Sequence, residues 1–230
     1  MVKSWFAHST MWNLTMPIQL NKLCQHSPYL YHLTYKPNLK WIKNTRCLKS
    51  AASLLKDGNH ELFLKQKRPE ILKFNVDGKL VTLTDQKTIN ENNISFEDGW
   101  SIADLIEAIN HRVFFWRGNK NGLLQFNQGH FEKYKNAENE LVFLRLEFEE
   151  TCKLNKDRGP EFCKYNSGAA RQNHGRRVPR GPKTFVKAEH ADFSLKDVKE
   201  VVFLNYVELP NKTQYCLDSF CGPWVDLQDY

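Results

Sequence analysis

Early in the chain, the spacing of hydrophobic positions changes within a few residues from every second residue to every third or fourth. The segment Leu30–Tyr35 has the apolar and aromatic content of a short strand, and Lys36-Pro37-Asn38 supplies residues that end one. Apolar residues then recur at helical spacing over Leu39–Leu55. The pattern predicts a strand that turns at once into an amphipathic helix. It places the last polar side chains of the strand, His32 and Thr34, near a helix N-terminus, which suits anions and polar ligands.

The remaining pattern predicts several further helices and strands. Residues 1–28 show no clear periodicity and are predicted to form an irregular arm, and residues 29–230 are predicted to form a single domain. We therefore expect an α+β fold with a mixed β-sheet core and flanking helices. In chain order, the elements are a helix over residues 60–74 that breaks ahead of Pro69, a hairpin turning at Gly78, a helix over Trp100–Ile109, and strands over Val113–Trp116 (ended by Gly118 and Asn119), Leu141–Phe148 and Lys199–Leu209.

The composition limits the cellular compartments and the classes of partner that we expect. No stretch approaches the roughly 20 apolar residues of a membrane span, and the N-terminal residues lack a signal-peptide pattern. We expect a cytoplasmic protein that does not enter a membrane. The net charge of +7 favours an acidic partner, which is a nucleic acid, an antitoxin protein or a phosphorylated cofactor. The six cysteines form no CxxC motif, so reduced thiols are expected and no metal is required.

Much of the positive charge falls in one segment, Cys163–Lys187. It contains glycines and prolines, and between Asn166 and Lys187 it has six basic residues and no acidic residue. The composition predicts a long basic loop, and long loops in compact domains are usually functional or disordered. In the functional interpretation the loop contacts a nucleic-acid backbone, with an affinity that falls as salt rises; in the alternative it is a solvated segment. The candidate nucleic-acid-binding residues are Arg171, Arg176, Arg177, Arg180 and Lys183.

His32 and Glu200 are the candidates for chemistry. A lone histidine on a strand is either a hydrogen-bonded core residue or a ligand, and Thr34 shares its face because strand side chains repeat every two positions. Glu200 precedes a strongly apolar strand, where a carboxylate either stabilises a developing cation or is a solvated edge charge. Glu189 and Glu208 are alternatives for the same role.

The aromatic run after residue 112 is flanked by two arginines. Arg112 and Arg117 are each able to grip a diphosphate through a bidentate guanidinium, or to be exposed cations. Such aromatic runs are more often core than stacking platforms. In the functional interpretation one ring, Phe115, stacks on a nicotinamide or adenine.

The motifs that contain these residues resemble, in their succession along the chain, those of a known family. The succession YHLT, NLxxI and SAASLL resembles the start of the DarT-type ADP-ribosyltransferases, in which a histidine-bearing first strand and the next helix begin the NAD pocket. The likeness covers about residues 29–210 and is closer still to a poorly characterised bacterial domain family related to them. Its blocks are YHLT (Tyr31–Thr34), TDQ (Thr84–Gln86), NHRVFFW (Asn110–Trp116), NSGAA (Asn166–Ala170) and KEVVF (Lys199–Phe203).

The resemblance implies an ADP-ribosyltransferase-like core and NAD as the substrate. It makes Glu200 the catalytic glutamate and gives His32 the NAD ribose or the nicotinamide amide. One departure is that Thr45-Arg46-Cys47-Leu48 replaces the usual glycine-leucine after the first helix. The implied cofactor-binding residues are His32 with Thr34 beside it, Ser50 and Ser53 on the adenosine side, Phe115, and Arg112 or Arg117 on the phosphates.

The function that follows is an NAD-dependent ADP-ribosyltransferase that modifies a base of RNA or DNA. The resemblance also implies a toxin of a toxin–antitoxin or anti-phage system, held silent by a cognate antitoxin. Two alternatives stay open: a non-enzymatic, basic nucleic-acid-binding protein, and an RNA-cleaving toxin. The first predicts salt-sensitive RNA binding without stabilisation by NAD, and the second predicts shortened RNA without any need for NAD.

Overall fold

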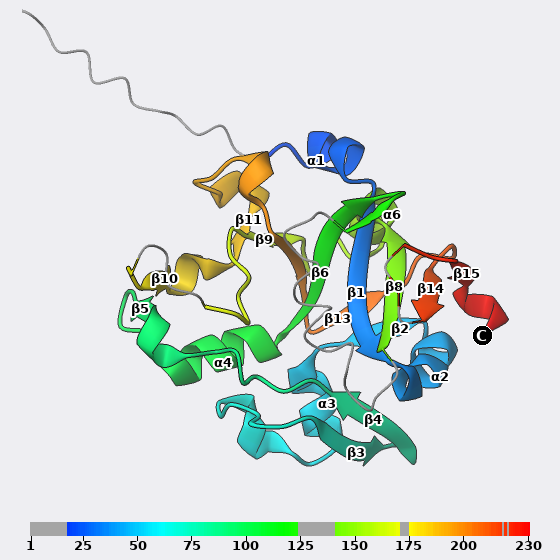
Figure 1. Cartoon of the computed structure of the whole chain (residues 1–230), viewed down its shortest axis with the longest axis horizontal. Coiled ribbons are helices and arrows are strands. Elements are labelled where there is room, and N and C mark those ends of the chain that lie inside the picture. Colours follow the sequence, from blue (N-terminus) through cyan, green and yellow to red (C-terminus); the bar gives the residue numbers. More distant parts are fainter. Residues whose placement is uncertain (1–17, 124–140, 171–174, 218, 220) are drawn as a thin grey trace, which may run out of the picture.

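A long antiparallel sheet forms the centre of the molecule (Figure 1). The computed structural model describes residues 18–123, 141–170, 175–217, 219 and 221–230. Within them, nine strands join this sheet. Their spatial order is β11 (Val186–Lys187), β9 (Glu161–Cys163), β12 (Glu200–Leu204), β6 (Arg112–Asn119), β1 (Tyr29–Tyr35), β8 (Leu141–Glu147), β14 (Gln214–Leu217) and β15 (Val225–Asp226), with β7 (Gly122–Leu123) paired to β6.

Three smaller strand pairs lie outside the main sheet. The hairpin turns through Asp77 and Gly78, which both have positive φ (49° and 72°), as a two-residue hairpin loop requires. The pairs are β3 (Leu72–Val76) with β4 (Lys79–Leu83), β2 (Cys47–Lys49) with β13 (Tyr206–Glu208), and the parallel pair β5 (Ile94–Phe96) with β10 (Val178–Arg180).

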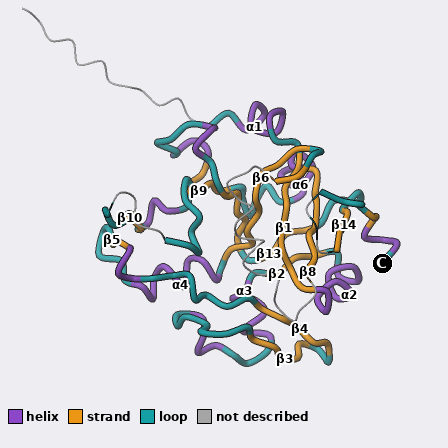
Figure 2. Tube along the Cα trace, in the orientation of Figure 1, coloured by secondary structure: helices purple, strands orange, loops and turns teal. Residues whose placement is uncertain are grey.

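Helices surround the sheet at its periphery, as Figure 2 shows. Ser101 begins one of them with a reciprocal capping box, in which its hydroxyl accepts from the Asp104 N–H and the Asp104 carboxylate accepts from the Ser101 N–H. The described α-helices are α1 (Leu20–His26), α2 (Lys36–Thr45), α3 (Ala51–Asp57), α4 (Ile102–Asn110) and α6 (Phe148–Leu154). Short 3₁₀ turns lie at residues 61–64, 91–93, 182–184, 188–190, 195–197 and 227–229.

The helix expected over Leu39–Leu55 is instead two helices with a strand between them. The strand β1 does end at Tyr35 and α2 begins at once, with Pro37 in its first turn. Arg46 then takes a left-handed conformation (φ 52°), which ends α2 in the way a glycine usually does. The chain next pairs with β13 as β2, a long-range contact that the local helical spacing does not reveal.

Three other predicted boundaries were wrong. Residues 60–74 form a 3₁₀ turn and then β3 rather than a helix. The strand β6 continues through Gly118 and Asn119, because these residues pair with Leu123 and Gly122 of β7. The expected strand Lys199–Leu209 divides at Asn205 (φ 62°), where the chain leaves the main sheet for β2.

The predicted α+β class is confirmed. The sheet, however, is antiparallel in all of its described pairings, whereas a mixed sheet was expected. Residues 18–28 of the expected irregular arm contain α1, which packs on α6. The main core lies between one face of the sheet and the helices, and includes Leu39, Leu55, Phe115 and Phe203. Among the described residues, no helix combines the length and the apolar character needed to cross a membrane.

Candidate functional site

The main sheet opens between its two central strands. Antiparallel pairing of β1 with β6 runs only from Tyr29 opposite Gly118 to Tyr31 opposite Trp116. Each strand continues its other pairing further, β1 with β8 as far as Tyr35 and β6 with β12 as far as Arg112. The two strands therefore separate beyond Tyr31, and a cavity of about 240 Å³ lies at this point, here called the cleft. Its polar lining residues include His32, Thr34, Asn38, Ser50, Arg68, Thr82, Gln86, Asn110, Arg112, Asn166, Ser167 and Glu200.

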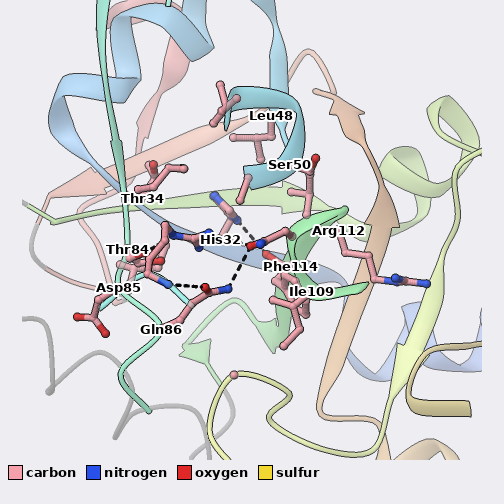
Figure 3. Close-up of a pocket in the computed structure, with 18 of the residues that line it drawn as sticks. His32, Thr34, Leu48, Ser50, Thr84, Asp85, Gln86, Ile109, Arg112 and Phe114 are labelled. Carbon is pink, nitrogen blue, oxygen red and sulfur yellow. Dashed lines mark hydrogen bonds between the residues drawn. The ribbon is translucent and has the colours of Figure 1, made fainter. Parts of the chain in front are cut away.

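His32 bridges the separating strands. Its Nδ1 lies 2.8 Å from the carbonyl oxygen of Phe114 on β6. A carbonyl oxygen only accepts, so Nδ1 carries the proton in this contact. Burial lowers the pKa of the imidazole below its ordinary value of 6.5. The ring is thus neutral at physiological pH, and its Nε2 is a hydrogen-bond acceptor at the wall of the cleft (Figure 3).

Glu200 lies at the first position of β12, directly opposite Trp116 of β6. Its side chain is 5% exposed, and the backbone N–H of Ser167 donates to both carboxylate oxygens, at 3.2 and 3.1 Å. Burial raises the pKa of this carboxyl to about 7, although the Ser167 hydrogen bonds and the positive charges of Arg180 and Lys199 oppose the rise. A carboxyl group with a pKa near the working pH, placed in a cavity, is typical of functional sites.

A buried polar cluster forms another part of the wall, and it includes Arg68, which the sequence did not single out. Arg68, only 4% exposed, donates from Nη1 to Asn110 Oδ1 at 2.8 Å and from Nε to the Thr84 carbonyl at 3.0 Å. Gln86 Nε2 donates to the same Asn110 oxygen at 3.1 Å, and its own Oε1 accepts from the Arg68 backbone at 3.1 Å. Figure 3 shows Gln86 within this cluster. The cleft therefore contains a fixed, buried guanidinium.

Asn38 ties the β3–β4 hairpin to the first strand. Its Nδ2 donates to Thr34 Oγ1 at 3.0 Å and to the Thr82 carbonyl at 2.9 Å, while its Oδ1 accepts from the Thr82 N–H at 2.9 Å. Thr82 Oγ1 and Asn166 Oδ1 are buried, and neither has a hydrogen-bond partner in the described part of the chain. Buried polar atoms of this kind call for an explanation, and a polar ligand in the cleft is one.

Three of the predicted cofactor-binding residues do not line the cleft. Arg117 lies on the opposite face of β6, where its Nε donates to the Val198 carbonyl at 2.9 Å. Phe115 is fully buried in the core, with its ring edge-on to Phe203 at 5.8 Å. Ser53 donates from its hydroxyl to the Asn205 carbonyl at 3.2 Å. The β-strand alternation explains the first two, because residues 113, 115 and 117 share one face and residues 112, 114 and 116 share the other.

The other predicted residues of the NAD pocket do border the cleft. Thr34 and Ser50 line it, and the Ser50 hydroxyl also caps α3 by accepting from the Ser53 N–H. Arg112 contributes to the lining, but its Nε is paired with Glu161 at 2.7 Å and its end points away from His32 in Figure 3. Of the three candidate glutamates only Glu200 borders the cleft; Glu189 and Glu208 are exposed.

The basic segment is not a uniform loop. Arg176, Arg177 and Lys183 are exposed, as a backbone-binding role requires, and Arg171 lies outside the described residues. Arg180 is only 2% exposed, and its guanidinium lies 4.1 Å from the centre of the Tyr165 ring. The expectation that Arg180 is a surface contact was wrong, because pairing of β10 with β5 draws this residue inward.

Metal ligation has no candidate in the part of the chain that the structure describes. No group of three or more His, Cys, Asp or Glu side chains there is arranged to hold an ion. All six cysteines are free thiols, and burial raises the pKa of Cys24 to about 11. The chemistry available at the cleft is therefore that of a carboxyl, an imidazole, a guanidinium, hydroxyls and amides.

Comparison with known proteins gives a family but no activity. No curated protein and no solved structure matches the chain at a significant level. A family model matches residues 28–211, which include β1, the cleft and β12. The chain belongs to the family described as a family of unknown function, DUF7002.

Proposed function

We propose that this protein is an NAD-dependent ADP-ribosyltransferase with an ADP-ribosyltransferase-like core, and that it modifies a nucleic-acid base as a toxin restrained by an antitoxin. The observation that supports the proposal is the meeting of His32 and Glu200 at one cleft, although they lie in the first and last parts of the chain. The cleft lies where two central strands separate, and both side chains line it. The exposed Arg176, Arg177 and Lys183 and the net charge of +7 favour nucleic acid as the acceptor.

The cleft fits part of a dinucleotide. Its volume of about 240 Å³ lies just below the range of about 300–1,000 Å³ that is typical of small-molecule sites, so it holds one nucleoside-sized half. The buried Thr82 Oγ1 and Asn166 Oδ1 have no hydrogen-bond partner among the described residues, so polar atoms of that half would bond to them. The guanidinium of Arg68 supplies positive charge for a diphosphate, the role first expected of Arg112 or Arg117.

NAD supplies an ADP-ribosyl group, and positive charge develops on its ribose as the bond to nicotinamide breaks. Ionised Glu200 stabilises this charge, and burial strengthens the interaction because the surroundings have a low dielectric constant. The N–H of Ser167 holds the carboxylate in place. The neutral ring of His32 accepts a hydrogen bond at Nε2 from a ribose hydroxyl, while Nδ1 remains bonded to the Phe114 carbonyl.

Labelled NAD tests the proposal. The full-length chain is incubated with the label and with RNA, DNA or cell protein, and the products are then treated with nuclease or protease. We expect label that nuclease releases, and a rate lower by about two to three powers of ten for Glu200→Ala. Asp226→Ala, an alteration outside the cleft, is the matched control and should transfer at the parent rate.

Other outcomes identify the alternatives. A parent melting temperature that NAD does not raise, together with salt-sensitive RNA binding, would establish a non-enzymatic binding protein. RNA shortened without NAD would establish a nuclease. Label that survives nuclease and disappears with protease would reject the nucleic-acid acceptor but keep the transferase.

A further inference from the structure

Asn166 has a side-chain oxygen that the described part of the fold leaves without a partner. This Oδ1 is buried and accepts no hydrogen bond from any described residue, although Asn166 lines the cleft. The surrounding turn is held by other groups: the Ala169 N–H donates to the Asn166 backbone carbonyl at 3.1 Å, and Thr88 Oγ1 donates to the Gly168 carbonyl at 2.5 Å. A buried amide oxygen that stabilises nothing in the folded chain is destabilising unless something else bonds to it.

The position of Asn166 connects it to the carboxylate. The N–H that Glu200 accepts belongs to the peptide group joining Asn166 to Ser167. The Asn166 side chain is therefore attached next to the peptide group that binds the Glu200 carboxylate, the group proposed to act on the ribose. The turn is held by the Ala169 N–H on the Asn166 carbonyl and by Asn93 Nδ2 on the Ala170 carbonyl, so the backbone that carries the Asn166 side chain is preorganised next to the Ser167 N–H.

An asparagine amide offers a carbonyl acceptor and an N–H donor side by side. It is complementary to a planar group with the same pair in reverse order, such as a carboxamide or the edge of a nucleobase. A phosphate only accepts hydrogen bonds, and a hydroxyl carries its donor and its acceptor on a single oxygen atom, so neither matches the two parallel hydrogen bonds of the amide.

We infer that Asn166 is a specificity-determining residue of the cleft, which binds the amide-type edge of a ligand next to Glu200. The inference rests on the proposed function, since that function brings two such edges to Glu200: the carboxamide of the leaving nicotinamide and the base of the acceptor. The two sources share one chemistry and are separated by experiment.

The test compares the parent chain with Asn166→Ala and with a control, Asn211→Ala, which alters an exposed asparagine outside the cleft. Melting curves and calorimetry use NAD, its analogue with a carboxylate in place of the carboxamide, nicotinamide and the free nucleosides. Without ligand, Asn166→Ala should melt within a few degrees of the parent, because the lost amide makes no hydrogen bond through its oxygen. With the ligand that carries the edge, Asn166→Ala should bind about tenfold more weakly, and Asn211→Ala should match the parent.

The ligand preference that Asn166→Ala loses identifies the molecule whose amide-type edge binds to Asn166. Loss of the parent's preference for NAD over its carboxylate analogue assigns Asn166 to nicotinamide, and loss of a preference among nucleosides assigns it to the acceptor base. If Asn166→Ala keeps both preferences within twofold, the inference is wrong while the proposed function stands. A parent that binds nucleosides but not NAD refutes the proposed function, and the nucleoside series still decides the role of Asn166. A parent stabilised by none of the probes refutes both.

Discussion

Replacing Glu200 with glutamine should stabilise the folded protein, and by an amount that depends on pH. The folded carboxyl keeps its proton up to about pH 7, whereas in the unfolded chain it loses the proton near its ordinary pKa of 4.5. Between these values the folded state binds more protons, so its stability falls as pH rises. Each pH unit in this window lowers the free energy of unfolding by about 1.4 kcal/mol, which amounts to about 3 kcal/mol over the whole window.

Glutamine keeps an oxygen for the Ser167 N–H but has no charge to desolvate. We therefore expect Glu200→Gln to match the parent at pH 4.5 and to be more stable by about 3 kcal/mol at pH 8, which corresponds to a melting temperature higher by about 6–12 °C. Urea denaturation of both chains from pH 4.5 to 8 measures the difference, and subtraction removes the titration of groups they share. A constant difference across that range would show that Glu200 ionises at an ordinary pKa, and the argument from burial would fail.

Three further predictions concern other parts of the site. His32→Ala should lower the free energy of unfolding by about 1 kcal/mol, because it removes the hydrogen bond to β6, and should weaken NAD binding in calorimetry. Arg68→Met should lower it by about 3 kcal/mol in urea denaturation, since it removes the charge-assisted hydrogen bonds to the Thr84 carbonyl and to Asn110. Arg176→Gln and Arg177→Gln should each reduce the slope of log affinity for RNA against log salt by about 1, while Arg180→Gln should destabilise the fold and leave that slope unchanged.

Local pattern was enough to predict the elements that carry His32 and Glu200. The strand β1, its turn into α2, the helix α4 and the strand β8 follow from spacing, capping and turn residues within short windows. The division of the helix at Arg46 and of the late strand at Asn205 follows from the pairing of β2 with β13, which joins residues far apart in the chain. No short window contains that information.

The same distinction applies to the cleft. Arg68 and Thr82 were missed because their places depend on packing against Asn110 and Asn38, distant in sequence. Arg117 and Phe115 were assigned to the cleft although the sequence itself contains a signal against this assignment. Strand alternation puts them on the face opposite Trp116, so applying it along the whole of β6 would have removed both.

The separation of β1 from β6 has a consequence for how this architecture can vary. The opening begins at Tyr31, where the two adjacent strands cease to pair; the His32 side chain is bonded across it to β6, and other side chains line its wall. Substituting the lining side chains should change which molecule binds in the cleft, while the opening between β1 and β6 remains. Proteins that share this sheet can thus acquire different chemistry through substitutions at a few lining residues, while the backbone of the sheet stays the same.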